Sequence, residues 1–140
     1  MINRESHLVK ALVDHLNSEH CPFSSNLVGF EFDYLAGRID VVATNTDGEL
    51  ISFEAKLDRW REALYQAYRN TSFCHFSYVV LPESTVQRAL KGRIEFERRG
   101  VGLCSVGASG IRIEILASKR EPLQPWLTRN AIAHAAACTN

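Results

Sequence analysis

Two apolar, strand-like runs separated by a short turn constrain this chain more than any other feature of its sequence. The runs cover residues 38–45 and 49–57, and the turn between them reads Thr46-Asp47-Gly48. This is the pattern of a β-hairpin. Asp40 interrupts the first run and Glu54 the second, although a buried sheet rarely contains ionisable side chains. The fold must therefore accommodate two carboxylates within or beside its core.

The length of the turn decides whether the two carboxylates share a face of the sheet. A two-residue loop would place Asp40 opposite Ala55, with Asp40 and Glu54 on different faces. A three-residue loop with Gly48 in the left-handed conformation places Asp40 directly opposite Glu54. We predict the three-residue loop. Lys56, two residues after Glu54, then points to the same face about 6 to 7 Å further along the strand.

The remaining patterns predict an α/β protein. Helical periodicity indicates helices over residues 3–19, 58–71 and 84–99, the last with Ile94 on its inner face and Gly100 ending it. Strands are expected at 27–35, at the hairpin, and at 76–81, 101–106 and 111–117. The order is helix, three strands, helix, strand, helix and two strands, which predicts a mixed sheet with helices on its faces.

The C-terminal part differs in character from the rest of the chain. We expect one domain over residues 1–117, followed over 118–140 by a linker and a short alanine-rich helix from Trp126 to Cys138. This helix would pack either on the domain or on a partner subunit. In the second case it would be an oligomerisation tail, and the protein a homodimer.

Charge and cysteine content narrow the class of protein. The net charge is zero, which argues against a protein that coats nucleic acid indiscriminately. Residues 1–57 carry a balance of −5, residues 58–100 of +3 and residues 101–140 of +2. This asymmetry suits an acidic metal site beside a basic rim, or simply solvated charged faces. Four widely spaced cysteines indicate free thiols, and because no signal peptide or membrane span is visible we expect a cytoplasmic protein.

Two carboxylates that meet at one point repel each other unless a cation or a proton lies between them. Mg²⁺ binds in proteins through one or two carboxylates and completes its shell with waters and phosphate oxygens. A nearby lysine would stabilise charge that develops on a phosphoryl group. The residues thus favour phosphodiester hydrolysis, the alternative being a surface salt bridge on a solvated sheet.

The combination of Asp40, then Glu54-Ala55-Lys56, then Gln66 in the following helix, with Glu5 in the first helix, resembles the PD-(D/E)XK nuclease superfamily. The similarity covers roughly residues 3–106 and implies a restriction-endonuclease-like αβββαβ core. It implies that Asp40, Glu54 and the Ala55 carbonyl bind the metal, and that Lys56 is the catalytic lysine. Glu5 would be an auxiliary acid, and Gln66 would contact substrate or orient Lys56. The chain departs from the pattern at Ile39, where the motif has proline, and at Asn70, where RecB-like nucleases have tyrosine four residues after the glutamine.

The resulting expectation is a Mg²⁺-dependent endonuclease, with Mn²⁺ as a substitute metal, that acts on DNA, with RNA as an open alternative. Candidate phosphate contacts are Arg59, Arg69, Lys91 and Arg93, which would position the backbone without reading bases. The competing hypothesis is a catalytically silent nuclease-like fold that serves as a nucleic-acid-binding or protein-interaction module.

Overall fold

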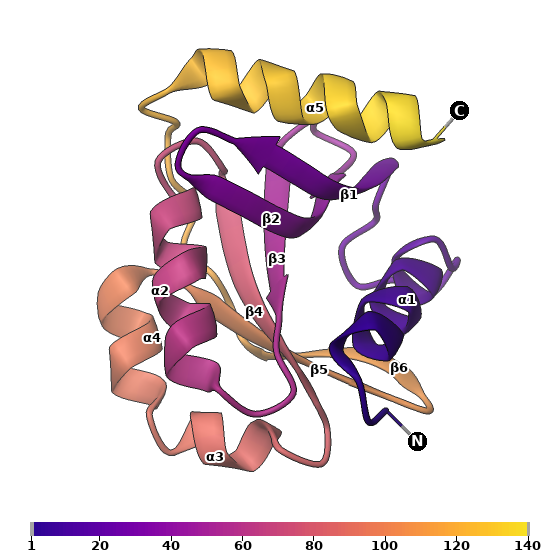
Figure 1. Ribbon diagram of the computed structural model, residues 1–140, viewed down its shortest axis with the longest axis vertical. Helices are drawn as coiled ribbons and strands as arrows, with labels where there is room; N and C mark the ends of the chain where they lie inside the picture. The colour runs from indigo at the N-terminus through magenta and orange to yellow at the C-terminus, as the bar shows by residue number, and fades with distance from the viewer. Residues whose placement is uncertain (1, 140) are drawn as a thin grey trace.

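The predicted hairpin lies inside a six-stranded mixed sheet with strand order β1-β2-β3-β4-β5-β6. The computed structural model describes residues 2–139. Strands β1, β2 and β3 pair antiparallel, β3, β4 and β5 pair parallel, and β6 returns antiparallel to β5 (Figure 1). The strands are β1 (Leu27–Tyr34), β2 (Gly37–Thr44), β3 (Leu50–Ala55), β4 (Phe76–Pro82), β5 (Gly102–Gly107) and β6 (Gly110–Ile115).

Helices cover both faces of this sheet. The apolar stripe of α1 packs on one face, and α2, α3 and α4 form a cluster on the other. The last helix, α5, lies across β1 and β2 at one end of the molecule (Figure 1). The predicted αβββαβ order within a mixed sheet flanked by helices is therefore confirmed. The helices are α1 (Glu5–Leu16), α2 (Trp60–Asn70), α3 (Val86–Leu90), α4 (Arg93–Arg99) and α5 (Pro125–Thr139).

The hairpin has the predicted register. The β2–β3 ladder pairs Thr44 with Leu50 and ends at Val41 and Phe53, so Asp40 and Glu54 are the next residues along the two strands. A three-residue loop closes it, because the Asn45 N–H donates to the Glu49 carbonyl at 3.1 Å. Gly48 has φ 76°, the left-handed conformation that the three-residue loop requires. The prediction that Asp40 and Glu54 lie opposite each other on the two strands is thus confirmed.

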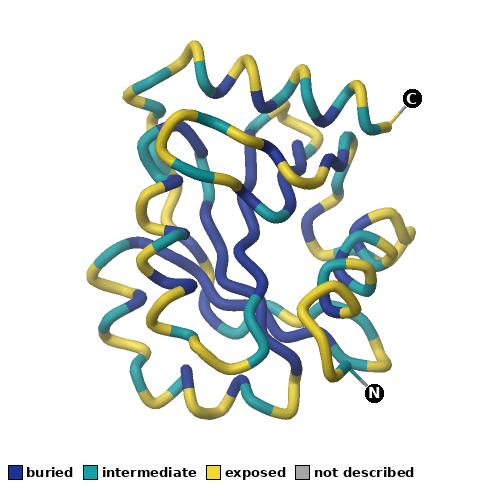
Figure 2. Tube along the Cα trace, viewed as in Figure 1, coloured by how far each residue is buried: buried dark blue, intermediate teal, exposed yellow. Residues whose placement is uncertain are grey.

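The buried residues are concentrated in the central strands of the sheet. Every residue of β3 is buried, and so is every residue of β4 after Phe76, while most exposed positions lie on the helices and turns (Figure 2). Strands buried on both faces read as continuous apolar runs, which explains why β3 and β4 show little alternation. Glu54 is the one charged residue among those six positions of β3.

The predicted helix over 84–99 is wrong as a single helix. It is broken into α3 and α4 at Gly92, where a Cβ atom would lie 2.3 Å from the Trp60 ring. Trp60 in turn stacks on Phe96 with ring centroids 5.6 Å apart. The break rotates α4 so that Phe96 is buried, while Ile94, expected inside, is 63% exposed. Gly100 ends α4 in the left-handed conformation, as predicted.

The C-terminal helix α5 packs on its own domain, which is one of the two arrangements expected for it. Ala131 and Ala135 are fully buried in a cluster with Phe32 and Phe73. The Thr128 hydroxyl donates to the Phe73 carbonyl at 2.6 Å and so fixes the start of the helix. The homodimer stays a prediction.

All four cysteines are free thiols, as the sequence indicates. Burial raises the pKa of the Cys74 and Cys104 thiols above their ordinary value. None of the helices between residues 2 and 139 combines the length and the apolar character that a bilayer-spanning segment requires.

The packing of α5 can be tested by enlarging one alanine. We expect Ala135→Leu to lower the free energy of unfolding by about 1–3 kcal/mol, because the added atoms meet a filled core. Ala137→Leu, on the exposed side of the same helix, is the matched control and should change it by less than about 0.5 kcal/mol. Urea unfolding measures both. Equal stabilities of the two variants would contradict the packing of α5 on the domain.

Candidate functional site

Asp40 and Glu54 form the centre of the candidate site. The Ala55 N–H donates to Asp40 Oδ2 at 2.8 Å, so a side chain takes over where the β2–β3 ladder has ended. Glu54 is only 2% exposed, whereas Asp40 is half-buried. Burial, and then the charge of the neighbouring Asp40, raise the pKa of the Glu54 carboxyl from 4.5 to about 8. Desolvation and repulsion by Asp40 thus both favour the protonated form of Glu54.

The backbone is distorted on the other side of Asp40 as well. The β1–β2 ladder pairs Phe30 with Val41 and Phe32 with Ile39 but skips Glu31 and Asp40. Glu31 has φ 54°, which is uncommon for a residue other than glycine. Asp40 therefore lies at a point where neither neighbouring strand pairs with it, and its carboxylate is free to turn toward Ala55.

A buried hydrogen-bond chain connects Glu54 to the surface of α2. The Asn70 side-chain amide donates to Glu54 Oε1 at 2.8 Å, and the Tyr34 hydroxyl donates to Asn70 Oδ1 at 2.7 Å. Arg69 Nε then donates to the Tyr34 oxygen at 2.9 Å. In the sequence, Asn70 stands out only as a departure from a family pattern. A signal was available, because Asn70 continues the buried stripe of Ala63 and Ala67 at helical spacing.

Lys56 directly follows β3, and its ammonium pairs with acidic side chains other than the two central carboxylates. Its Nζ is 3.3 Å from Glu62 Oε1 and 3.9 Å from Glu5 Oε1. Among residues 2–139 it makes no ion pair within 4.0 Å with Asp40 or Glu54. Lys56 is thus held between the first turns of α1 and α2, by Glu5 and Glu62.

Glu5 forms an ion pair in the structure, whereas the Gln66 side chain forms no hydrogen bond within residues 2–139. Glu5 is the first residue of α1 and pairs with Lys56, and its role as an auxiliary acid stays a prediction. Gln66 is half-buried on α2, and no hydrogen bond of its side chain occurs within residues 2–139. Glu62, one turn earlier on the same helix, makes the contact with Lys56 that we expected of Gln66. A contact between Gln66 and substrate stays a prediction.

The four candidate phosphate contacts divide into two pairs. Arg59 and Arg69 stand near the two ends of α2, beside Glu62 and Tyr34 respectively. Lys91 is exposed in the turn between α3 and α4, and Arg93 Nη2 donates to the Glu114 carbonyl at 3.4 Å. The first pair flanks the elements that carry the carboxylate site, while the second lies toward β6.

The donor set fits a hard divalent cation. Asp40 and Glu54 supply two adjacent carboxylates whose repulsion a cation would relieve, and Mg²⁺ needs no more protein ligands than these. Within residues 2–139 no group of three or more histidine, cysteine, aspartate or glutamate side chains is arranged to hold a metal. The closed four-ligand cage of a structural zinc site is therefore not formed by the described residues.

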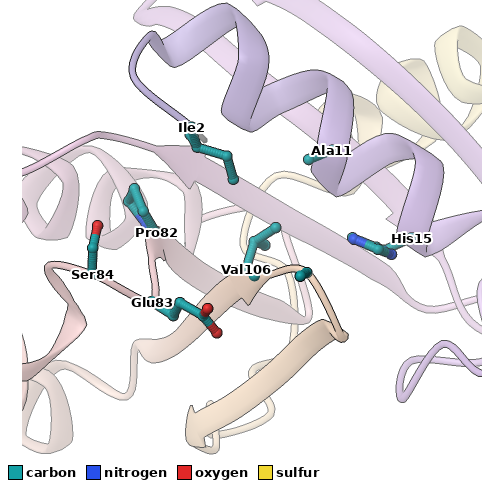
Figure 3. A pocket seen from close by; sticks show the side chains of 9 residues that line it. Ile2, Ala11, His15, Pro82, Glu83, Ser84 and Val106 are labelled. Carbon is teal, nitrogen blue, oxygen red and sulfur yellow. The ribbon is translucent and has the colours of Figure 1, made fainter.

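Of the hollows that adjoin α1, one reaches Asp40. A hollow of about 380 Å³ between α1 and β1 includes Asp40 in its wall, together with Glu31 and Lys10. A larger cavity of about 440 Å³ lies between α1 and the ends of β4 and β5 (Figure 3). Its polar side chains are His15, Glu83 and Ser84, and it includes no candidate site residue. The smaller hollow therefore borders Asp40, the more exposed of the two central carboxylates.

Comparison with known proteins supports the fold. No protein-family model and no curated protein matches the sequence. A solved structure of a protein of unknown function from Silicibacter pomeroyi, SPO1766, matches 98% of this chain and 89% of its own, with a TM-score of 0.69 at 18% identity. The shared architecture thus extends over nearly the whole of both chains.

Two further solved structures match less well. A repair endonuclease from Pyrococcus abyssi has a TM-score of 0.43 at 18% identity, and the match covers 66% of this chain and 45% of that one. SfsA from Pyrococcus furiosus, solved with Ca²⁺, has a TM-score of 0.40 at 13% identity, covering 81% and 61%. Similarity at this level supports no assignment, so the functional argument depends on the site itself.

The raised pKa of Glu54 predicts how stability depends on pH in the absence of divalent metal. The folded protein binds this proton more tightly than the unfolded chain, whose glutamate titrates near 4.5. The corresponding stabilisation is complete below about 4.5 and is lost as the pH rises through about 8. We expect the free energy of unfolding, measured with urea in EDTA, to fall across this window.

The matched variant is Glu54→Gln, which keeps an acceptor for Asn70 but cannot ionise. It should flatten the fall in stability between these pH values. If the variant and the wild type show the same slope, the titration belongs to another group and the interpretation of Glu54 is wrong.

Proposed function

We propose that this protein is a divalent-metal-dependent nuclease that hydrolyses phosphodiester bonds in DNA. One observation carries the proposal: Asp40 lies beside a buried Glu54 at the point where the β2–β3 ladder ends. A buried glutamate whose pKa is raised to about 8 lowers the stability of the fold at neutral pH relative to low pH, so the arrangement calls for a functional explanation.

Asp40, Glu54 and the Ala55 carbonyl would hold Mg²⁺, or Mn²⁺ in its place. When bound, such an ion polarises a phosphoryl oxygen and lowers the pKa of a coordinated water. Asn70 orients Glu54 by occupying one carboxylate oxygen, and the Ala55 N–H does the same for Asp40. The remaining oxygen of each carboxylate is left for the cation, which is the arrangement that outer partners of metal ligands usually provide.

Lys56 supplies positive charge next to this pair. With 19% of its side chain exposed, it is shielded enough to act strongly on charge that develops on a phosphoryl group. Glu62 and Glu5 hold its ammonium at the first turns of α2 and α1. Substrate entry would move Lys56 from these partners toward the phosphate, and Gln66 would contact the substrate from the same side of α2.

DNA as substrate is supported by the charge of the surrounding helices. Arg59 and Arg69 lie near the two ends of α2, and Lys91 and Arg93 lie at the turn between α3 and α4. Contacts of this kind bind the phosphate backbone without reading bases. They serve RNA equally, so the substrate test includes both.

One observation favours the catalytically silent alternative. The ion pairs of Lys56 are made with Glu62 and Glu5, at 3.3 and 3.9 Å, and not with the central carboxylates. A protein that had lost activity would keep such pairs as structural contacts. Cleavage and metal binding must therefore be measured separately.

Cleavage of linear, branched and single-stranded DNA and of RNA in Mg²⁺ or Mn²⁺ tests the proposal. We expect Asp40→Asn and Lys56→Ala each to reduce cleavage by about 100-fold or more, the usual cost of removing one group that stabilises the transition state. Asp47→Asn, at the exposed tip of the same hairpin, is the matched control and should cleave normally.

Calorimetric titration with Mn²⁺ separates the two roles. Asp40→Asn should lose Mn²⁺ binding, because a ligand is gone, whereas Lys56→Ala should keep it. If no substrate is cut and the wild type binds no Mn²⁺, the nuclease proposal is wrong and the silent-module alternative replaces it.

A further inference from the structure

Every arginine found over an aromatic ring in residues 2–139 belongs to a pair that involves α2. The Arg99 guanidinium lies 5.5 Å from the Tyr65 ring centre and that of Arg120 lies 6.0 Å from Tyr68. The other two pairs are Arg61 over Trp60 at 4.3 Å and Arg69 over Tyr34 at 5.8 Å. Such pairs are expected about once in 70–80 residues, so their gathering along one helix marks a distinct surface.

We call this the Arg–Tyr surface. Figure 1 shows α2 lying beside α4, the helix that contributes Arg99, and Arg120 comes from the segment that follows β6. The surface extends about 12 Å along α2 at 1.5 Å per residue. Its members are Arg61, Tyr65, Tyr68, Arg69, Arg99 and Arg120.

Tyr65 and Tyr68 are both exposed to solvent. Tyr65 is 60% exposed and Tyr68 is 45% exposed, and within residues 2–139 neither hydroxyl takes part in a hydrogen bond. Positions 65 and 68 are neighbours on one helix face. Each ring is approached by an arginine, while much of its remaining surface is open to solvent.

Three of the guanidinium groups carry charge that no carboxylate balances. Arg69 donates to the Tyr34 hydroxyl, Arg99 to the Glu95 carbonyl at 3.0 Å and Arg120 to the Arg99 carbonyl at 2.7 Å, and all three acceptors are neutral oxygens. Among residues 2–139, none of the three lies within 4.0 Å of a carboxylate oxygen. Arg61 differs, because it pairs with Glu95 at 3.2 Å. The surface therefore presents fixed positive charge beside open aromatic rings.

This combination matches the chemistry of an unpaired nucleic-acid strand. Arginines neutralise phosphates, and exposed aromatic rings stack on bases, each stacked base adding affinity regardless of its identity. In a duplex the base faces are covered by neighbouring base pairs, so exposed tyrosines gain nothing from it.

The surface is also connected to the catalytic carboxylates. Arg69 lies against the β1–β2 turn, where Gly37 leaves room for it because a Cβ atom would come within 2.6 Å of Arg69 Nη2. From there the chain of hydrogen bonds through Tyr34 and Asn70 reaches Glu54. Arg69, a member of the Arg–Tyr surface, is thus connected to Glu54 by three successive hydrogen bonds.

We propose that the Arg–Tyr surface binds a single-stranded DNA segment, by stacking bases on Tyr65 and Tyr68 and pairing phosphates with Arg69, Arg99 and Arg120. The inference extends the proposed function by naming the form of substrate that the nuclease engages. It assigns to α2 a role in substrate binding in addition to its role in holding Lys56 and Glu54.

Fluorescence anisotropy with labelled oligothymidylate and with a duplex of equal length tests the inference. The full chain is used in EDTA, so that no cleavage occurs and binding is independent of the metal site. We expect the single strand to bind at least about tenfold more tightly than the duplex, with affinity that falls as salt rises.

The double variant Tyr65→Leu/Tyr68→Leu should weaken single-strand binding by about tenfold or more, because stacking is lost. Tyr65→Phe/Tyr68→Phe keeps both rings and should bind within about twofold of the wild type. Arg99→Gln should reduce the salt dependence of binding, because a phosphate contact disappears. Unchanged melting temperatures confirm that these substitutions, of two exposed tyrosines and the half-buried Arg99, leave the fold intact.

Equal binding of single strand and duplex would overturn the inference, as would full affinity of the leucine variant or no DNA binding at all. Its failure is distinguishable from failure of the proposed function. Asp40→Asn should bind the single strand in EDTA like the wild type, whereas cleavage and Mn²⁺ binding report on the carboxylates alone.

Discussion

The placement of a buried Glu54 beside Asp40 is the constraint on which the rest of the site depends. A carboxylate in the interior is costly unless neighbouring groups compensate it. Here Asn70 satisfies one oxygen, and the pKa of Glu54 rises to about 8 because burial and Asp40 both disfavour its charge. The hairpin that carries both acids therefore takes a hydrogen-bond partner from α2, and the two neighbouring carboxyl groups still favour a proton or a cation between them.

Helix α2 supplies what the hairpin lacks. Its last turn provides Asn70, its first turn provides Glu62 for Lys56, and its buried stripe of small residues lets it approach β3 and β4 closely. The opposite side of the same helix presents Tyr65 and Tyr68 to solvent. One element thus connects the sheet, the candidate catalytic groups and the Arg–Tyr surface. A rigid helix is well suited to this, because groups along it keep fixed spacings.

Much of the fold follows from local sequence patterns. The element order could be predicted because the periodicities of strands and helices differ, and the hairpin register because a three-residue loop ending at Gly48 fixes the parity of all the flanking side chains. The single helix expected over 84–99 was wrong for the opposite reason. Its break is at Gly92, which packs against the Trp60 ring of a different helix, and no local pattern reports that contact.

Some features of the candidate site could likewise be predicted from local sequence, and others could not. The sequence by itself determined that Asp40 and Glu54 lie opposite each other, since alternation along two strands joined by a short turn is a local property. Only the tertiary structure decided the partners of these groups. Asn70 donates a hydrogen bond to Glu54, and Glu62 rather than Gln66 pairs with Lys56. These contacts depend on the depth and rotation at which α2 packs on the sheet, which the whole core sets and no short stretch of sequence encodes.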